Sequence, residues 1–374
     1  MKLILKIKLL PTDEQINLLL NTMREANAAC NAISNIAWQE NIFNNFKLHY
    51  RTYHTYKAVF KLSSQMVIRQ IAKVADSYKL DKKTKRNFKL LGSIAYDSRI
   101  ITYKSNNVVS LWCIGGRQKI NFVCHNSDYI PYIKGEADLV YKKGKFYLFQ
   151  TVDVPEESPK DTENFVGVDF GLISIATLST GKEFSSKKLQ DYREKRQKIR
   201  SSVQSKCTRG SKKLLKRLSG KERTTTSIIN HTIAKQIVQT AKEENKGIAL
   251  EDLKGIRFSS LKKSKKFRTR VGKWSFNQLR QYISYKAALN GVSVILVNPR
   301  YTSKTCNKCH HIGNRNGKLF KCTNCGNSMD ADINASLNIA TLGCSVNNSE
   351  KSSMYSCALH YLDLKSIPTL CADR

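Results

Sequence analysis

Two Cys-x-x-Cys pairs near the end of the chain constrain the fold more than any other feature of the sequence. The pairs are separated by 12 residues and consist of Cys306, Cys309, Cys322 and Cys325. Four thiolates at this spacing are typical of a tetrahedral zinc site, and an iron–sulfur cluster or disulfides are less favoured. We interpret His310 and His311 as surface residues, because the cysteines already complete the tetrahedron. No coordination position is left for a substrate, so the sequence predicts a structural zinc centre.

Three carboxylates stand where an acidic side chain is costly unless it has a function. Asp169 interrupts the apolar stretch VGVDFG, where we expect it at the centre of a strand, and Glu251 ends the apolar strand IALE. Asp332 is expected in the first turn of the last helix. The expected order of elements, β-β-β-α-β-α-β, is the pattern of the ribonuclease-H fold, in which the first and fourth strands are neighbours. Asp169 and Glu251 should therefore lie side by side.

A cluster of three carboxylates predicts bound divalent cations. Adjacent carboxylates raise one another's pKa unless cations neutralise them. Hard oxygen ligands suit Mg²⁺. Two such ions about 4 Å apart would activate a water and stabilise a leaving 3′ oxygen during phosphodiester hydrolysis.

Two further aspartates compete for these roles. Asp252 follows Glu251 directly, and side chains alternate between the two faces of a strand, so Asp252 should point to the opposite face. Asp330 precedes the last helix, and we interpret it as a cap or a residue that supports the site. The trio Asp169, Glu251 and Asp332 remains the preferred assignment.

The charge of the chain indicates a polyanionic partner. The formal net charge is +35 and the pI is about 9.8. Such a surplus favours nucleic acid, whose phosphates bind Lys and Arg with release of counterions, over an anionic membrane surface. The sequence contains no run of about 18 apolar residues, so it predicts no membrane span. The first ten residues, MKLILKIKLL, alternate with period two and predict a strand, not a signal peptide.

The cysteines outside the zinc site favour a reducing compartment. Of 11 cysteines, seven are scattered singly, and an odd total without an export signal indicates reduced thiols in the cytoplasm. A strongly basic chain that binds DNA is further expected to associate with the nucleoid.

The basic charge is concentrated between Lys187 and Arg223, where few acidic residues neutralise it. A charged stretch is often only a solvated helix face, but this density favours contact with phosphates. A second basic segment, Lys262–Lys273, is expected to be a loop, and core packing is the favoured role of the following Trp274. The phosphate-binding candidates in the first stretch are Arg196, Arg200, Lys212, Lys213, Lys216 and Arg217.

Several motifs resemble those of the TnpB family of insertion-sequence proteins, often described as OrfB-type transposases and related to type V CRISPR effector nucleases. The motifs are VGVDFG, ALEDL, YTSKTCNKC, FKCTNCG and DADINASLNIA, and the resemblance covers most of the chain. It places the catalytic carboxylate of DAD on its second aspartate, Asp332. His310 and Asn298 depart from the residues frequent in the family, and neither belongs to the trio.

The resemblance implies a multidomain α/β architecture. A ribonuclease-H-like (RuvC) nuclease domain would carry an inserted zinc ribbon, and a β-barrel-like wedge domain interrupted by a helical bundle would precede it. The expected boundaries are 1–45 and 93–158 for the split wedge domain, 46–92 for the helical recognition insertion, 160–302 and 328–342 for the nuclease domain, 303–327 for the zinc ribbon and 343–374 for a loosely ordered tail.

The resemblance also implies an activity, RNA-guided DNA cleavage. The partners would be target DNA and a guide RNA derived from the transposon end, with zinc as the structural metal and Mg²⁺ as the catalytic one. Two alternatives stay open: a non-cleaving, guide-RNA-dependent DNA-binding regulator on the same scaffold, and a strand-transfer transposase. A regulator should have lost a member of the trio, and all three are present, which favours the nuclease. The oligomeric state is open.

Overall fold

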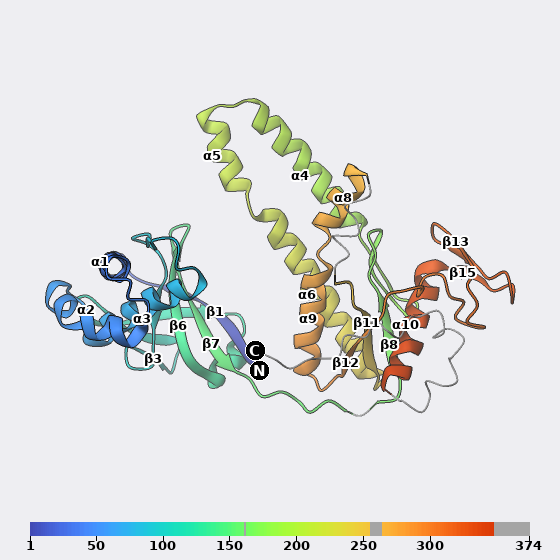
Figure 1. Ribbon diagram of the computed structural model, residues 1–374, viewed down its shortest axis with the longest axis horizontal. Helices are drawn as coiled ribbons and strands as arrows, with labels where there is room; N and C mark the ends of the chain where they lie inside the picture. Colours follow the sequence, from blue (N-terminus) through green and yellow to red (C-terminus); the bar gives the residue numbers. More distant parts are fainter. Residues whose placement is uncertain (161, 255–263, 348–374) are drawn as a thin grey trace. The chain divides into compact units, whose positions relative to one another are not determined.

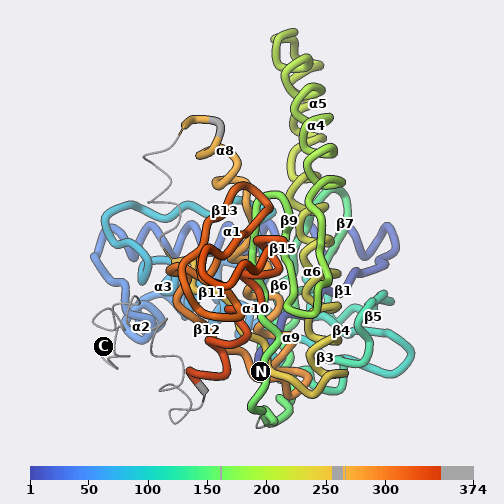
Figure 2. Tube along the Cα trace, turned by 90° about the vertical axis from the view of Figure 1, so that its right-hand side faces the viewer, coloured from blue at the N-terminus to red at the C-terminus, as the bar shows by residue number. Residues whose placement is uncertain are grey.

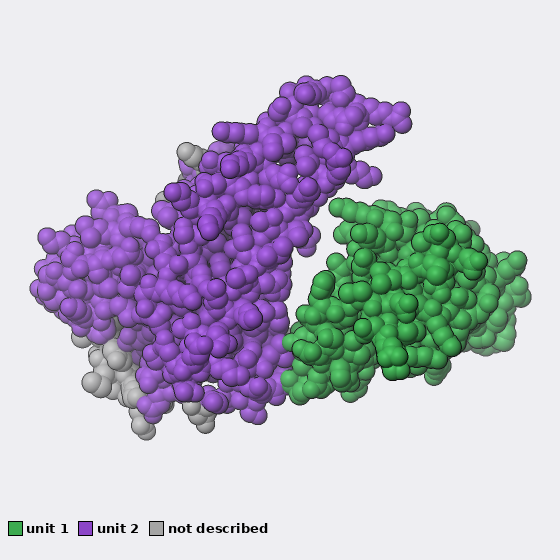
Figure 3. Space-filling view, turned by 180° about the vertical axis from the view of Figure 1, so that it is seen from behind, with its two compact units in different colours: residues 1–155 green, residues 156–374 purple. Residues whose placement is uncertain are grey.

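The computed structural model describes residues 1–160, 162–254 and 264–347 and divides into two compact units (Figures 1 and 3). Unit 1 is Met1–Pro155, and unit 2 begins at Glu156. The division falls in the polar, proline-containing stretch 155–164. None of the helices in the described ranges has the length and apolar character needed to cross a membrane. The finer domain boundaries remain a prediction.

Unit 1 is built on a seven-stranded antiparallel sheet with the order β2-β6-β7-β1-β5-β4-β3. The hydroxyl of Tyr96 on β2 donates to the backbone oxygen of Trp112 on β4 at 3.0 Å. This bond links the first strand of the order to the last but one, so the sheet curls into an almost closed barrel. A 3-10 turn, η1, spans Ser127–Tyr132, and the strands are β1 (Lys2–Leu10), β2 (Ile94–Tyr96), β3 (Ile101–Lys104), β4 (Val108–Cys113), β5 (Gly116–Cys124), β6 (Ile133–Lys142) and β7 (Lys145–Asp153).

Three helices interrupt this sheet between β1 and β2: α1 (Asp13–Gln39), α2 (Asn45–Val59) and α3 (Ser64–Leu80). Thr12 and Gln15 form a capping box at the start of α1, since each side chain bonds to the other's backbone N–H group. Ser63 caps α3 by accepting a hydrogen bond from the Met66 N–H. An apolar stripe of α3 that includes Val67, Ile71 and Val74 is buried, as expected for a helix that packs against its neighbours.

Unit 2 contains a five-stranded sheet with the order β10-β9-β8-β11-β12 (Figure 1). The first three strands along the chain are antiparallel to one another, and β8, β11 and β12 are parallel. The strand that comes fourth along the chain therefore lies beside the first. The strands are β8 (Phe165–Asp169), β9 (Ser174–Leu178), β10 (Glu183–Ser185), β11 (Gly247–Glu251) and β12 (Val294–Val297).

Helices cover both faces of this sheet. Val166 and Val168 on β8 pack into a core that includes residues of α6 (Lys221–Glu243) and α9 (Phe276–Ala288). The opposite face, which includes Phe165, packs against α10 (Ala331–Asn347). Both faces are buried, so β8 and β11 do not alternate but are apolar up to their last residues, Asp169 and Glu251.

Two helices, α4 (Lys187–Ser205) and α5 (Arg209–Leu218), form a long hairpin between β10 and α6. They lie side by side in both views and extend away from the sheet (Figures 1 and 2). Leu189 and Ser211 are the buried residues of the pair. Such a hairpin is held by its base and presents the rest of its surface to solvent.

The structure corrects three expectations. Asp169 is the last residue of β8, not its centre, because the chain turns at once through Gly171, where an added Cβ would lie 2.8 Å from the Ser174 oxygen. Residues 265–273 of the expected basic loop form helix α8 (Lys265–Lys273), capped by the hydroxyl of Ser264. The other loop residues, 262 and 263, lie outside the described ranges.

The third correction concerns the expected tail after residue 342, because α10 continues to Asn347. Gly343 lets the helix approach β11: a Cβ at this position would lie 2.8 Å from the Cβ of Ala249. The rest of the tail, 348–374, lies outside the described residues.

Candidate active site and metal centre

The three predicted carboxylates line one cavity of about 800 Å³ in unit 2. Leu250 on β11 pairs with Val168 on the parallel strand β8. One residue further along both strands, Asp169 and Glu251 end their strands at the same edge of the sheet. Parallel pairing therefore places two side chains that are 82 positions apart in the sequence at one site.

Asp332 reaches the same cavity from the first turn of α10. The helix can lie this close because β8 carries Gly167 where the two elements cross. A Cβ at Gly167 would lie 2.0 Å from the Ser336 carbonyl oxygen and 2.5 Å from the Ala340 nitrogen. Any larger residue would push α10, and Asp332 with it, away from β8.

Burial and mutual repulsion make these carboxyls hard to ionise. Burial is the main cause that raises the pKa of Asp169 to about 8, and the charges of Glu251 and Asp332 raise it further. Burial also raises the pKa of Glu251 to about 7 against the opposing hydrogen bond from Thr302 and the charge of Arg315. Carboxyls that hold protons near neutral pH are typical of sites that function with a bound cation.

This pKa shift leads to a stability prediction for metal-free protein. A carboxyl whose pKa is raised in the folded state binds more protons there than in the unfolded chain, so folding becomes less favourable as pH rises from about 4 to about 8. Asp169→Asn removes this titration. In EDTA, the melting temperature of the wild type should therefore fall relative to that of Asp169→Asn between pH 5 and 8. Parallel pH curves for the two proteins would contradict the raised pKa.

Two residues that the sequence analysis did not identify also contact the trio. The hydroxyl of Thr302 donates to Glu251 Oε1 at 2.6 Å and fixes the carboxylate. Arg315 donates from Nη2 to Asp332 Oδ1 at 2.8 Å and supplies a positive charge to the cavity. Arg315 lies on a hairpin of the predicted zinc ribbon. The ribbon directly precedes Asp332 in the sequence, and this proximity is the signal that could have identified a ribbon residue as a neighbour of the trio.

The competing aspartates point elsewhere. Asp252 pairs with Arg280 at 3.1 Å and does not line the carboxylate cavity. Asp330 accepts hydrogen bonds from the N–H groups of Asp332 and Ile333, at 2.8 and 3.2 Å, so it caps α10. Its cap holds the first helical turn in place.

The four cysteines form the predicted metal-binding cluster. Their sulfur atoms all lie within 4.8 Å of one another, and the Sγ atoms of Cys306 and Cys325 are 3.6 Å apart. This separation is close to the roughly 3.8 Å expected across a tetrahedron with Zn–S bonds of about 2.3 Å. His311 is exposed and His310 half-buried, and neither belongs to the cluster. The site therefore fits a closed structural zinc ion.

The cysteine cluster anchors a small three-stranded sheet of β13 (Asn314–Asn316), β14 (Leu319–Lys321) and β15 (Ser328–Asp330). Asn338 and Asn334 on α10 donate to the Thr305 oxygen, both at 2.7 Å, and hold the start of this ribbon. Lys318, at the tip of the β13–β14 hairpin, pairs with Glu183 at 2.9 Å. The ribbon is thus tied to the main sheet beside the carboxylates.

The candidate phosphate-binding residues lie together on the α4–α5 hairpin and not at the carboxylate cavity. Arg196 Nε donates a hydrogen bond to the hydroxyl oxygen of Tyr192 at 3.1 Å. The other five are exposed: Arg200, Lys212, Lys213, Lys216 and Arg217.

Comparisons with known proteins point to one group. Residues 149–256 match the OrfB_IS605 family model, described as "Probable transposase", and residues 276–339 match the model "Cas12f1-like, TNB domain". The TnpB-like protein MJ0751 of Methanocaldococcus jannaschii is 33% identical over 52% of this chain and 68% of its own length. A CRISPR-associated endodeoxyribonuclease, Cas12f1 of Sulfoacidibacillus thermotolerans, is 31% identical over 53% of this chain and spans 50% of its own length in the match.

Among solved structures, a Cas12f1–sgRNA–target DNA complex aligns with a TM-score of 0.40 and 17% identity, over 91% of this chain and 99% of that one.

Proposed function

The chain belongs to the TnpB-like family, and from this premise we propose that it is an RNA-guided DNA endonuclease that hydrolyses phosphodiester bonds at the cavity lined by Asp169, Glu251 and Asp332. The convergence of three acidic side chains from β8, β11 and α10 is the observation that carries the proposal. The name of the Cas12f1 relative, an endodeoxyribonuclease, supports it.

We assign unit 2 to the RuvC type of ribonuclease-H fold. Its strand order, with the first strand between the second and the fourth, supports this assignment. So does the placement of the acids at the ends of β8 and β11 and at the start of α10. The zinc ribbon would be an insertion between β12 and α10.

The donor set fits divalent cations. Three carboxylates face one cavity, and two of them have raised pKa values that a bound cation would lower. Asp169, Glu251 and Asp332 would hold two Mg²⁺ ions, because hard oxygen ligands suit that metal. When bound, the ions would supply Lewis acidity for phosphodiester hydrolysis.

The neighbouring residues have separate roles. Thr302 orients the Glu251 carboxylate through its 2.6 Å hydrogen bond. Arg315 balances the charge of the carboxylates before substrate arrives, and its guanidinium lies where it can then bind a phosphate oxygen. Asp330 fixes the helical turn from which Asp332 projects.

The experiment that tests the proposal is isolation of the protein with its bound nucleic acid. Sequencing should recover one defined, structured RNA, and the complex should cleave matching DNA in Mg²⁺ or Mn²⁺, weakly in Ca²⁺ and not in EDTA. Cleavage in EDTA would overturn the metal mechanism. A defined RNA without cleavage would favour the regulator, and strand joining without RNA would favour the transposase.

We further propose that the α4–α5 hairpin binds the backbone phosphates of the guide RNA or of an RNA–DNA duplex. We predict that neutralising Arg196, Arg200, Lys212, Lys213, Lys216 and Arg217 together lowers the salt dependence of binding. Each lost phosphate contact should reduce the slope of log K against log salt by about 0.9 for duplex, equally for all target sequences. An unchanged slope would mean that the hairpin is only solvated, and a changed sequence preference at constant affinity would contradict a backbone role.

A further inference from the structure

Thr177 on β9 lies directly opposite Asp169 in the β8–β9 pair. The pair before it, Val168 and Leu178, packs into the core formed with α6 and α9. Side chains alternate between the two faces of a sheet, so Thr177 and Asp169 lie on the other face, which α10 covers. Directly opposite residues of an antiparallel pair have Cβ atoms about 5 Å apart. The Thr177 side chain is therefore a close neighbour of the Asp169 carboxylate.

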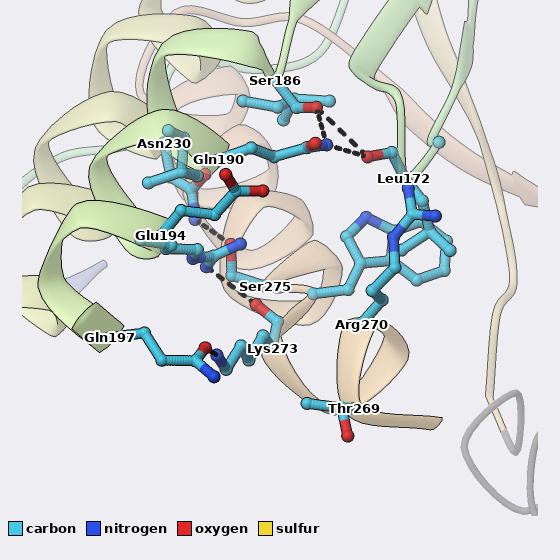
Figure 4. Close-up of a pocket in the computed structure, with 15 residues that line it drawn as sticks. Leu172, Ser186, Gln190, Glu194, Gln197, Asn230, Thr269, Arg270, Lys273 and Ser275 are labelled. Carbon is cyan, nitrogen blue, oxygen red and sulfur yellow. Dashed lines mark hydrogen bonds between the residues drawn. The ribbon is translucent and has the colours of Figure 1, made fainter. Parts of the chain in front are cut away.

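The Thr177 hydroxyl is buried without a hydrogen-bond partner. Thr177 is 2% exposed, and its Oγ1 bonds to none of the described residues. It lines neither the carboxylate cavity nor the neighbouring cavity of about 530 Å³ drawn in Figure 4. An unpaired buried hydroxyl destabilises a fold, whereas an apolar group of the same shape does not. Stability alone therefore does not favour a threonine here, and its hydroxyl indicates a function.

Asp169 differs from the other two acids of the trio in its hydrogen bonds. Glu251 accepts a hydrogen bond from Thr302, and Asp332 accepts one from Arg315. Within the described ranges, no residue donates to the Asp169 carboxylate, on which its neighbours act through burial and charge. Two of the three proposed metal ligands are thus oriented by a donor. The third has an unused donor on the adjacent strand.

Glu183 on β10 is the other carboxylate beside Thr177, because it pairs with Thr177 on the far side of β9. The Glu183 carboxylate is already engaged. The hydroxyl of Ser174 donates to it, and Lys318 donates to it at 2.9 Å. The Thr177 hydroxyl is therefore left for Asp169.

The turn between β8 and β9 is fixed from the side of α4. Gln190 on α4 donates to the Leu172 oxygen at 2.9 Å, and the hydroxyl of Ser186 donates to the same oxygen at 3.2 Å (Figure 4). A turn held by two side chains maintains the register of the strands that it joins. The position of Thr177 opposite Asp169 is therefore built into the fold.

We propose that Thr177 is a positioning residue that orients Asp169 for metal binding. Its hydroxyl donates to one oxygen of the Asp169 carboxylate when that carboxylate holds a cation, as Thr302 does for Glu251. Donors that contact metal ligands in this way fix the orientation of the ligand and raise metal affinity. The proposal rests on the proposed function, because it concerns a ligand of the same metal site.

Two substitutions separate the hydroxyl of Thr177 from its methyl group. Thr177→Val keeps the shape and removes the hydroxyl, and Thr177→Ser keeps the hydroxyl and removes the methyl. Binding of Mn²⁺ to the full chain, loaded with zinc and free of nucleic acid, is measured by electron paramagnetic resonance. Asp169→Asn identifies the ions that the carboxylate cavity holds. Thr177→Val should bind these ions about tenfold more weakly, and Thr177→Ser should match the wild type.

The melting temperature without added Mn²⁺ or Mg²⁺ is the second measurement. Thr177→Val should be at least as stable as the wild type, because it loses no hydrogen bond, and Thr177→Ser should be less stable, because it loses a buried methyl. A less stable Thr177→Val would reveal a structural hydroxyl and overturn the proposal. Wild-type Mn²⁺ affinity in Thr177→Val, or a loss of affinity in Thr177→Ser, would overturn it as well. Unchanged Mn²⁺ binding by Asp169→Asn would refute the proposed metal site itself, and this inference with it.

Discussion

Asp169→Ala, Glu251→Ala and Asp332→Ala should each lower DNA cleavage by about 10³-fold or more while guide RNA and target DNA still bind within a few-fold of wild type. The three acids line one cavity and come from three different elements, so each supplies ligands that the other two cannot replace. Residues that act as one unit give large single losses that do not add. Cleavage and binding of one guided complex should be measured side by side, and the double variants should be no worse than the single ones.

The isosteric changes Asp169→Asn and Glu251→Gln separate loss of charge from loss of shape. They preserve packing in a site where Glu251 is 6% exposed, and they should be as inactive as the alanine variants. If the amide variants are active, the carboxylates are structural and do not hold metal.

Asp330→Ala is the matched control, because it lies two residues from Asp332 and is also acidic. It removes the two capping bonds of α10, and the expected cost is about 1 kcal/mol of stability. Cleavage should persist, because Asn334 and Asn338 still anchor the helix to Thr305. An inactive Asp330→Ala together with an active Asp332→Ala would assign the third ligand to Asp330.

The sequence was informative where a local pattern determines the placement of a residue. Apolar runs predicted β8 and β11. Because these two buried strands pair in parallel, their last residues, Asp169 and Glu251, lie at one edge of the sheet. The spacing of the cysteines predicted a cluster that the structure contains. Each apolar run and each Cys-x-x-Cys pair is contained within a few residues.

The sequence was less informative where the placement depends on contacts between distant segments. Arg315 is an ordinary arginine in a polar hairpin, and its role appears only when the ribbon folds back onto Asp332. The expected basic loop became α8 because the cap by Ser264 and the apolar contact of Val271, which is 2% exposed, outweigh its charge. Trp274 was expected in the core, and it does pack there, but it also lines two cavities.

Replacing Cys322 with serine should remove zinc, stability and cleavage together. Cys322 is buried, and its sulfur is 3.5 Å from that of Cys309, so a serine leaves the metal one thiolate short. The binding energy of such a site is largely folding energy. The β13–β14 hairpin carries Arg315 to Asp332 and Lys318 to Glu183, and loss of the metal should release both contacts.

The experiment measures zinc content, melting temperature and cleavage for three variants. Wild type should contain one zinc ion per chain. Cys207→Ser, at an exposed free thiol outside the cluster, should match the wild type in all three measurements. Arg315→Ala should keep its zinc and its melting temperature but lose cleavage, which separates the ribbon as a scaffold from the arginine that it positions. Iron at the site would refute the assignment of zinc. Fully active protein without metal would refute a structural role for the ion, because the hairpin would then hold Arg315 in place without metal bound to the cysteines.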